Sequence, residues 1–383
     1  MKYRKFGSLD WEVSALSFGA MRLPILNNDP AQIDEPEASR MVRTAIDAGV
    51  NYIDTAYPYH QEASEPFVGR VLKDGYREKV RLATKMPSWL VEEAADFDRL
   101  LETQLERLDV ARIDFYLLHS LNEKLWAKFN NLDVFSWAEK RMAEGLFDHF
   151  CFSFHDAYPV FESIVNGYDN WTMAQIQYNY IDEDYQAGKK GLQLAADRGL
   201  AVVIMEPLRG GRIARNPAPE PVAVLFNESK RDWTPAAWAF HWVWNQPQVA
   251  TTLSGMSTMA QVEENLELAD QSDAGLLTDQ DLMLIEKVKD VYESLAPIPC
   301  TQCEYCLPCP SGVAIPRIFD FYNDAVSYDA WDRSRMAYRE FIKREEQADH
   351  CVECGECETA CPQNIQIIKW LARAHEMLSE PER

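Results

Sequence analysis

The chain has 383 residues, of which 26% are charged, and its formal net charge is −23. This length exceeds what one small core requires, and it predicts either one large domain with an appendage or two domains. Because so acidic a surface repels phosphate, we expect no nucleic acid among its partners.

The N-terminal segment carries charges but lacks the apolar stretch of a secretory signal. No segment approaches the roughly 18 consecutive apolar residues that a membrane-spanning helix needs. We therefore expect a cytoplasmic location and no membrane partner.

Short apolar segments alternate with amphipathic ones as far as Asp270. The apolar segments predict eight strands, at 16–19, 50–53, 80–84, 113–118, 149–153, 173–176, 200–204 and 249–253. Amphipathic segments such as 36–48 and 97–108 predict helices between them. Eight strands that alternate with helices predict an α/β fold, the (β/α)8 TIM barrel. A doubly wound sheet is the competing fold, but the GxGxxG fingerprint it would need is absent after the first strand.

The composition changes after Asp270. Residues 278–295 predict one more helix, which two prolines end, and eight of the nine cysteines follow between Cys300 and Cys361. We place a domain boundary there, with the barrel at 1–295 and a small cysteine-rich domain at 296–383. So dense a group of cysteines in a reducing compartment predicts bound metal.

These cysteines form two groups, and in each group three lie three residues apart and a fourth precedes a proline. The groups are Cys300, Cys303, Cys306 and Cys309, followed by Cys351, Cys354, Cys357 and Cys361. In two-cluster ferredoxins, a fourth cysteine of this kind binds the other cluster. The pattern therefore predicts two [4Fe-4S] clusters, the first held by Cys300, Cys303, Cys306 and Cys361 and the second by Cys351, Cys354, Cys357 and Cys309. Structural zinc is the alternative, although zinc sites usually pair two CxxC motifs across a loop.

Segment 315–348, between the two groups, is rich in helix formers and aromatic residues and shows no strand alternation. It predicts that the second domain is α-helical and ferredoxin-like. The ninth cysteine, Cys151, lies in a predicted strand and is expected to be a buried core thiol.

Four polar residues lie at or just beyond the ends of three successive predicted strands: Asp54, Tyr59, Lys85 and His119. Each alone has an ordinary explanation, such as an exposed loop tyrosine or a buried core histidine. Together they fall at the carboxyl ends of barrel strands, where the active sites of such barrels lie. Reduction of a carbonyl group needs a proton donor at such a site, and a tyrosine hydroxyl can act as that donor.

The neighbours of this tyrosine suit that role. A tyrosine has an ordinary pKa of about 10, which is too high for ready proton donation near neutrality. An ammonium about 4 Å from a phenolate stabilises it by roughly 4 kcal/mol at an effective dielectric near 20, or about 3 pKa units. We therefore expect Lys85 to lower the pKa of Tyr59. We expect Asp54 to keep Lys85 charged and in place, and His119 to donate a hydrogen bond to the substrate oxygen.

Over residues 1–295 the sequence resembles the aldo/keto reductase superfamily. The matching motifs are Tyr3 to Pro24 with its Gly19, Asp54 to Tyr59, Thr84-Lys85, Leu117 to His119, Gln175 to Asn179 and Gly255 to Asn265. With its cysteine-rich tail, the chain is similar to the subgroup that carries a C-terminal 4Fe-4S dicluster domain. The resemblance implies an oxidoreductase with Tyr59 as the acid, Lys85 and Asp54 as the pair that tunes it, and His119 as the orienting residue.

The resemblance also implies a nicotinamide cofactor that lies across the strand ends. The residues implied in its binding are Ser153, Gln175, Met205, Glu206, Pro207, Leu208, Gly255, Ser257, Gln261 and Asn265. Segment 255–261 contains no basic residue to bind a 2′-phosphate, so NADH and NADPH both stay open. Phe154 and Met205 stand where many members have an asparagine and a stacking aromatic ring, which leaves a flavin open as well.

Three functions are compatible with these features. The first is reduction or oxidation of a small-molecule carbonyl or alcohol with NAD(P)H, with the clusters supplying or removing electrons. The second is a ferredoxin-linked reductase, in which the clusters feed a flavin or the substrate directly. The third is a non-catalytic electron carrier subunit, against which the complete set of four polar residues argues. Ferredoxin or another redox protein is a candidate partner.

Overall fold

A computed structural model describes residues 1–27, 29–300, 305–361 and 363–380 of the chain. Its residues form two compact units. The first consists of Met1–Gly210 and Ala236–Thr278, and the second of Gly211–Pro235 and Asp279–Arg383. The second unit thus includes a segment from well before residue 296, and the domain boundary near that residue stays a prediction.

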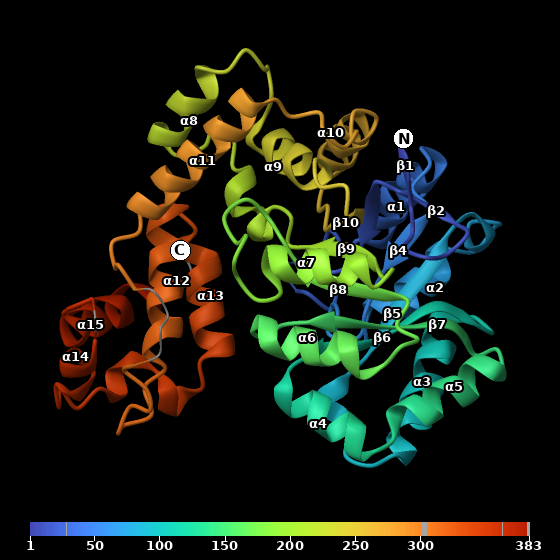
Figure 1. Ribbon diagram of the computed structural model, residues 1–383, viewed down its shortest axis with the longest axis horizontal. Coiled ribbons are helices and arrows are strands. Elements are labelled where there is room, and N and C mark those ends of the chain that lie inside the picture. The colour runs from blue at the N-terminus through green and yellow to red at the C-terminus, as the bar shows by residue number, and fades with distance from the viewer. Residues whose placement is uncertain (28, 301–304, 362, 381–383) are drawn as a thin grey trace. The chain divides into compact units, whose positions relative to one another are not determined.

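The first unit contains a closed barrel of parallel strands in the order β10-β3-β4-β5-β6-β7-β8-β9 (Figure 1). The strands are β3 (Leu16–Gly19), β4 (Tyr52–Asp54), β5 (Arg81–Met86), β6 (Ile113–Leu121), β7 (Phe147–Phe154), β8 (Met173–Gln177), β9 (Ala201–Met205) and β10 (Val249–Ser254). All eight predicted strands are present, and the pairing of β10 with β3 closes the barrel. The predicted (β/α)8 TIM barrel is therefore confirmed, and the competing doubly wound sheet is excluded.

The strand ends differ from the predicted ends at three polar residues. β4 ends at Asp54, β5 continues to Met86, and β6 continues to Leu121. Asp54, Lys85 and His119 therefore lie within strands, where backbone pairing holds them in place. Because all the strands of the barrel are parallel, these three side chains belong to the same end of the barrel.

The barrel strands form because their apolar runs are buried on both faces, as is typical of parallel strands. One cluster of buried side chains joins β4 through β10 and fills the barrel interior. Its members from these strands are Tyr52, Ala83, Phe115, Leu117, Cys151, Met173, Ala201, Val203, Ala250 and Leu253. The side chain of Cys151 is fully buried, which confirms the prediction of a core thiol.

An N-terminal hairpin of β1 (Tyr3–Lys5) and β2 (Glu12–Ser14) was not predicted. Each of its strands has three residues, which is too short for a periodic pattern to be recognised. The buried ring of Phe6, at the end of β1, packs on Phe115 near the start of β6, with the ring centroids 4.9 Å apart. The hairpin therefore covers the amino-terminal end of the barrel and leaves the carboxyl ends of the strands free for chemistry.

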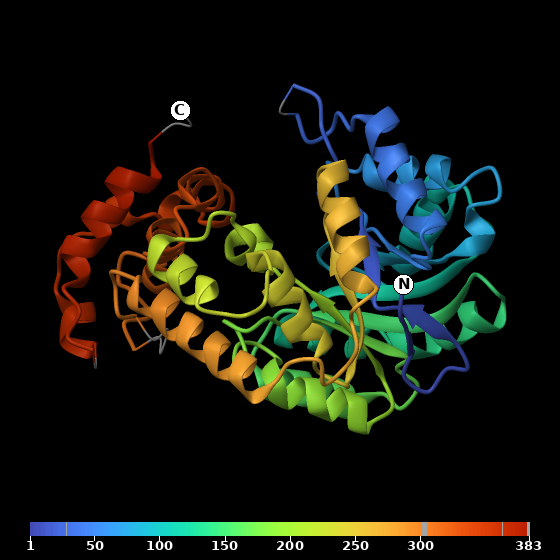
Figure 2. The ribbon, with the colours of Figure 1, turned by 90° about the horizontal axis from the view of Figure 1, so that it is seen from above.

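Helices connect the strands and cover the outside of the barrel. They are α1 (Glu35–Asp47), α2 (Ser64–Val71), α3 (Ala95–Leu108), α4 (Glu123–Asn131), α5 (Val134–Ala143), α6 (Tyr158–Gly167), α7 (Gly188–Asp197), α9 (Pro235–Trp244) and α10 (Met259–Ala269), with short 3-10 helices η1 (Arg77–Lys79) and η2 (Ser88–Leu90). Helix α10 lies beside α1 (Figure 2), and α6 lies beside α7. Asp34 caps α1 by accepting a hydrogen bond from the Glu37 amide, which lets the helix begin where the apolar face begins.

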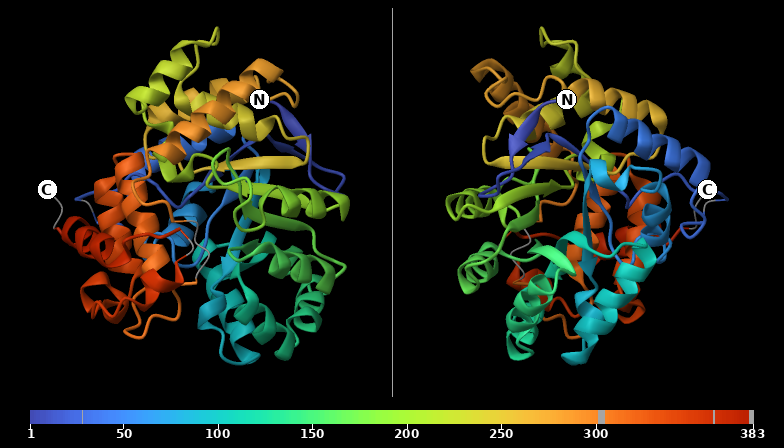
Figure 3. Two further views of the ribbon diagram at one scale, coloured as in Figure 1. Left: turned by 60° about the vertical axis from the view of Figure 1, so that its left-hand side comes forward. Right: turned by 90° about the vertical axis from the view of Figure 1, so that its right-hand side faces the viewer.

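The second unit is helical in the residues described, as predicted. Its helices are α8 (Glu220–Asn227), α11 (Asp279–Ser294), α12 (Ile315–Ser327), α13 (Trp331–Phe341), α14 (Glu356–Ala360) and α15 (Ile367–Leu378), with 3-10 helices η4 (Arg344–Glu346) and η5 (Ala348–His350), and η3 (Arg209–Ala214) spans the junction of the units. α8 lies beside α11 and α12 beside α13 (Figure 3). α12 and α13 lie between the two cysteine groups. Among the described helices of either unit, none has both the length and the apolar composition that crossing a membrane requires.

Candidate functional site

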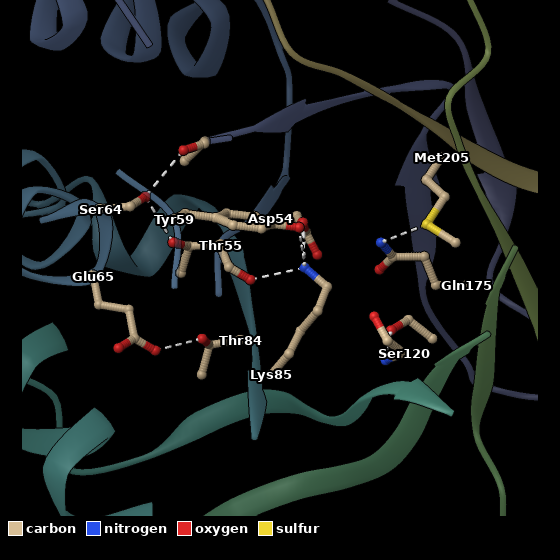
Figure 4. A network of polar contacts seen from close by, with 12 residues as sticks. Asp54, Thr55, Tyr59, Ser64, Glu65, Thr84, Lys85, Ser120, Gln175 and Met205 are labelled. Carbon is tan, nitrogen blue, oxygen red and sulfur yellow. Dashed lines mark hydrogen bonds and ion pairs between the residues drawn. The ribbon is translucent and has the colours of Figure 1, made fainter. Parts of the chain in front are cut away.

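Lys85 and Asp54 meet at the carboxyl ends of two neighbouring strands, β5 and β4. The Lys85 Nζ donates a hydrogen bond to the Asp54 carboxylate at 2.6 Å and another to the Thr55 carbonyl oxygen at 2.8 Å. It also lies 3.4 Å from the Tyr59 hydroxyl oxygen (Figure 4). The side chain of Lys85 is fully buried, so its charge is held between these groups rather than solvated. The structure thus brings three of the four predicted residues together.

The loop that carries Tyr59 is held by a histidine that the sequence analysis did not single out. His60 has a positive φ of 53°, and its Nε2 accepts a hydrogen bond from the Leu23 amide at 3.1 Å. The other ring nitrogen, Nδ1, therefore carries the proton and donates it to the Pro30 carbonyl oxygen at 2.8 Å. Burial lowers the pKa of His60, in keeping with this neutral ring. His60 ties the Tyr59 loop to the loop that follows β3.

A buried polar network lies behind Lys85 and was also missed. Gln104, on α3, donates hydrogen bonds to the Lys85 carbonyl oxygen at 3.0 Å and to the Glu65 carboxylate at 2.5 Å. Thr84 donates its hydroxyl proton to the same carboxylate at 2.6 Å (Figure 4). The only sequence signal was a glutamine on the buried face of a helix. The network fixes the backbone that carries Lys85.

His119 completes the predicted set of four. Its ring centroid lies 6.1 Å from that of Tyr59 and 5.2 Å from that of Trp89. The pairing of β6 with β7 shifts register between Leu118 and Leu121, an irregularity of the kind that re-aims a side chain. Burial lowers the pKa of His119 well below its ordinary value, and the charge of Lys85 lowers it further. The imidazole is therefore neutral near pH 7.

The protonation of Tyr59 differs from the sequence-based expectation. Burial raises the pKa of Tyr59, Lys85 opposes that increase, and Asp54 adds to it, so that the pKa is above its ordinary value. The sequence-based prediction that Lys85 lowers the pKa of Tyr59 was wrong in direction because it left out the effect of burial. Burial likewise disfavours the charged form of Lys85, but Asp54 and Tyr59 outweigh it and raise the pKa of Lys85. Near neutrality, Lys85 is therefore charged and Tyr59 is protonated.

Three of the residues implied in cofactor binding lie on β7, β8 and β9, and two of them, Gln175 and Met205, lie across from Lys85 in Figure 4. The Ser153 hydroxyl accepts a hydrogen bond from the Ser120 amide at 2.8 Å. The Gln175 Nε2 points to the Met205 sulfur at 3.7 Å (Figure 4). The Gln175 Oε1 is buried and has no hydrogen-bond partner among the described residues. A buried acceptor of this kind suits a ligand that carries an amide N–H group.

The other implied cofactor residues follow β9 and β10. Glu206 pairs with Arg22 at 2.9 Å, and its carbonyl oxygen accepts a hydrogen bond from Asn179 at 3.1 Å. Pro207 is buried. Leu208 is partly buried and packs against the cluster of buried side chains that includes Leu16 and Phe240.

Of the four implied residues that follow β10, Gly255 and Ser257 lie in the loop before α10, and Gln261 and Asn265 lie on α10. Gly255 lies against the Arg22 side chain, which a Cβ at that glycine would meet at 3.4 Å. The Ser257 amide donates to Gln261 Oε1 at 2.8 Å, and Asn265 donates to the Ser254 hydroxyl at 3.1 Å. The implied residues therefore gather along β7 to β10 and the segments that follow them.

Three cysteines of the second group lie close to one cysteine of the first. Cys309, Cys351, Cys354 and Cys357 line a single pocket. Burial raises the pKa of the Cys357 thiol, and nearby Cys351 and Cys309 raise it further. These are the four residues that the sequence pattern assigns to one cluster, so the donor set suits a group that needs four thiolates.

The remaining thiols of the tail are less fully described. Cys300, Cys306 and Cys361 are partly buried against the core of the second unit, and Cys303 lies outside the described residues. As the described residues are placed, no three His, Cys, Asp or Glu side chains converge at ligand distances on one metal position, so the two cluster ligand sets stay a prediction.

Two family models match the chain. The model of the aldo/keto reductase family matches residues 15–290. The model of the 4Fe-4S dicluster domain matches residues 299–366. The two matches together leave few residues at either end unmatched.

Among curated proteins, a 126-residue segment is 37% identical to "Probable aldo-keto reductase 1" of Glycine max, covering 31% of this chain and 36% of that protein. The match thus spans about a third of the length of that relative. A 328-residue match to "Uncharacterized oxidoreductase YqkF" of Bacillus subtilis is 22% identical and covers 77% of this chain and 99% of that protein.

Among solved structures, the aldo-keto reductase AKR11C1 from Bacillus halodurans in its holo form is similar with a TM-score of 0.61 and 26% identity, over 75% of this chain and 96% of that one. An aldo-keto reductase from Klebsiella pneumoniae in complex with NADPH has a TM-score of 0.62 and 22% identity, over 75% and 95%. This second likeness supports the barrel fold alone.

Proposed function

The chain belongs to the aldo/keto reductase family and is an oxidoreductase with a C-terminal 4Fe-4S dicluster domain, and we propose that it reduces the carbonyl group of a small molecule, with Tyr59 as the proton donor. One observation carries the proposal. The buried ammonium of Lys85 reaches both the Asp54 carboxylate, at 2.6 Å, and the Tyr59 hydroxyl, at 3.4 Å. An ionisable trio at a barrel's catalytic end, with perturbed pKa values, is a favoured arrangement for proton transfer.

The protonation states support reduction as the direction. Tyr59 keeps its proton near neutrality because burial raises its pKa, and a protonated phenol is the form that can donate. When the proton leaves, the adjacent Lys85 ammonium stabilises the phenolate that forms. Asp54 holds that ammonium charged and 2.6 Å from its carboxylate. His119, neutral at this pH, carries one N–H that can donate to the substrate oxygen.

The pH dependence of reduction follows from these directions. Because the pKa of Tyr59 lies above its ordinary value of about 10, we expect the reduction rate to stay level from about pH 7 to about pH 9 and to fall only above about pH 10. Initial rates measured with a simple aldehyde across this range check the expectation. A decline centred near pH 7 would instead mean that Lys85 outweighs burial and lowers the Tyr59 pKa.

The residues that would hold a nicotinamide are those along β7 to β10. Gln175 offers an unpaired buried carbonyl oxygen to the carboxamide group, with Ser153 on the neighbouring strand. Gly255 and Asn265, which follow β10, are proposed to bind the adenosine end. When bound, a nicotinamide supplies the hydride that carbonyl reduction needs. The protein residues orient it, exclude water and provide the proton.

Nucleotide preference can be tested at Gln261. Placing arginine there is expected to raise the ratio of kcat/KM for NADPH to kcat/KM for NADH about tenfold, because a guanidinium binds a 2′-phosphate in a bidentate manner. Gln271→Arg, at an exposed position just after α10, is the matched control. An unchanged ratio, or an equal gain in the control, would remove Gln261 from the proposed nucleotide site.

The tail is proposed to hold two [4Fe-4S] clusters. Cys309, Cys351, Cys354 and Cys357 share one pocket, which supports the ligand set of one cluster. The other cluster would take Cys300, Cys303, Cys306 and Cys361. Each cluster transfers single electrons. A soluble ferredoxin or another one-electron protein is then the proposed redox partner of this chain.

A ferredoxin-linked reductase with a flavin is the second candidate. It is favoured by the absence of basic residues in 255–261 and by Met205, which lies against Gln175 where many relatives place an aromatic ring. Protein purified without oxygen separates the two candidates. NAD(P)H-dependent reduction of an aldehyde with no acid-released flavin supports the first, and bound flavin with no NAD(P)H turnover supports the second. Zinc in place of iron in the same preparation would contradict the proposed clusters.

A further inference from the structure

The loop after β5 carries an aromatic side chain to the barrel mouth. After Met86, the single 3-10 turn η2 places Trp89 beside His119, with ring centroids 5.2 Å apart. The Trp89 side chain remains 47% exposed, which is high for so large an apolar group. A half-exposed indole beside the proposed orienting histidine is suited to contact the body of a substrate.

A lysine on α4 donates hydrogen bonds to the backbone of this loop. The Lys128 Nζ, on α4, donates to the carbonyl oxygens of Ser88 at 2.8 Å and Val91 at 2.7 Å. These carbonyls lie on either side of Trp89 in the chain. A turn as short as η2 leaves its carbonyl groups without helical donors, and an ammonium provides charge-assisted hydrogen bonds to them. The Ser88 and Val91 side chains are buried, so both ends of the turn are fixed.

Lys128 is anchored to the element that carries His119. Strand β6 ends at Leu121, and the next residue, Asn122, caps α4 by accepting a hydrogen bond from the Leu125 amide at 2.9 Å. The neighbour of Lys128, Phe129, is fully buried and packs on Phe97 of α3, with ring centroids 5.9 Å apart. One rigid segment therefore carries both His119 and Lys128, and Lys128 links it to the Trp89 loop.

We propose that Lys128 is a positioning residue that holds Trp89 beside His119 and thereby lets the site favour bulky, flat carbonyl compounds over small aliphatic ones. The inference rests on the proposed carbonyl reduction. Lys128 acts through Trp89, so its loss loosens one wall of the site and leaves Asp54, Lys85 and Tyr59 in place. Binding of a flat substrate then weakens, whereas turnover of bound substrate does not.

The kinetic test compares three variants with two aldehydes, benzaldehyde and propanal. Lys128→Met keeps the apolar stem and removes the ammonium, and it is expected to raise KM for benzaldehyde about tenfold with kcat within about twofold. KM for propanal should change by less than about twofold. Lys128→Arg keeps the charge and two donors, so it should restore most of the benzaldehyde KM. Lys124→Met, exposed one turn earlier on α4, is the matched control and should behave as the parent.

A substitution at Trp89 itself shows whether the effect of Lys128 on KM passes through Trp89. Trp89→Phe should itself raise KM for benzaldehyde. Adding Lys128→Met to Trp89→Phe should cause no further increase, because the indole that Lys128 positions is no longer present. Additive effects would mean that Lys128 acts elsewhere. Equal changes in Lys124→Met, or an unchanged KM in Lys128→Met, would overturn the proposal.

A spectroscopic readout keeps this test independent of the proposed activity. The chain has 11 tryptophans, so the emission of Trp89 is obtained as the difference between each protein and its Trp89→Phe counterpart. Acrylamide quenching of that difference is expected to rise about twofold in Lys128→Met and to be unchanged in Lys124→Met. If the parent reduces no aldehyde, the proposed function fails, and the quenching measurement still tests whether Lys128 positions Trp89. If Lys128→Met folds poorly, Lys128→Gln serves the same comparison against Lys128→Arg.

Discussion

Replacing Tyr59 with phenylalanine is expected to lower carbonyl reduction by about 100-fold to 10,000-fold, the size of a lost general acid. The change removes one hydroxyl, and the Lys85 ammonium keeps its hydrogen bonds to Asp54 and to the Thr55 carbonyl oxygen. Removing Lys85 instead would leave Asp54 buried without its counter-charge, at a cost of about 3 to 5 kcal/mol in stability. Tyr59→Phe is therefore the variant that separates chemistry from folding.

The measurement needs both kcat with a simple aldehyde and the dissociation constant of the nucleotide. Nucleotide affinity should stay within about twofold of the parent, because none of the residues proposed to hold it contacts the Tyr59 hydroxyl. Tyr57→Phe is the matched control, since Tyr57 lies two positions earlier in the same loop, with Arg107 stacked on its ring at 4.1 Å. Full turnover by Tyr59→Phe, or an equal loss in Tyr57→Phe, would refute the assignment of the acid.

If each cluster takes its fourth cysteine ligand from the other group, pairs of cysteine substitutions should remove either one cluster or both. Alanine at both Cys309 and Cys357 is expected to lower the iron content from about eight to about four atoms per chain, because the two belong to one cluster. Alanine at both Cys361 and Cys357 is expected to remove nearly all the iron, because one ligand is taken from each cluster. If each group bound its own cluster, the two results would be reversed.

Iron and acid-labile sulfide per chain, together with the visible absorption before and after dithionite, are the measurements. Cys151→Ala is the control, since this thiol is buried inside the barrel and belongs to neither group. Its iron content should equal that of the parent. A parent protein with one cluster, or with zinc, would contradict the two-cluster proposal directly.

The barrel could be predicted from the sequence because its signal is local. Each strand, such as β9, is a short run rich in apolar residues, and burial on both faces of a parallel strand requires that composition. The same argument misses β1 and β2, which have three residues each. It also placed His119 beyond its strand, since the irregular end of β6 depends on pairing with β7.

The four polar residues could be predicted because the carboxyl ends of parallel barrel strands all lie at the same end of the barrel. Asp54, Lys85 and His119 needed no tertiary information beyond that rule. His60 and Gln104 could not be predicted in this way, because neither lies at the end of a strand. A histidine in a loop and a glutamine on a helix gain their roles only from partners distant in the sequence. His60 binds Leu23 and Pro30, which precede it by 37 and 30 positions.

The sequence by itself determined the strand order, the cysteine spacing and the identity of the polar residues at the barrel's carboxyl end, since periodicity and spacing act over a few residues. Only the tertiary structure decided the protonation of Tyr59, because burial in the closed barrel outweighs the single charge of Lys85. Only the structure revealed the contact of Lys128 with the Trp89 loop, because these groups lie 37 to 40 positions apart in the chain. Burial and long-range contacts depend on the whole packed fold, and no local pattern encodes them.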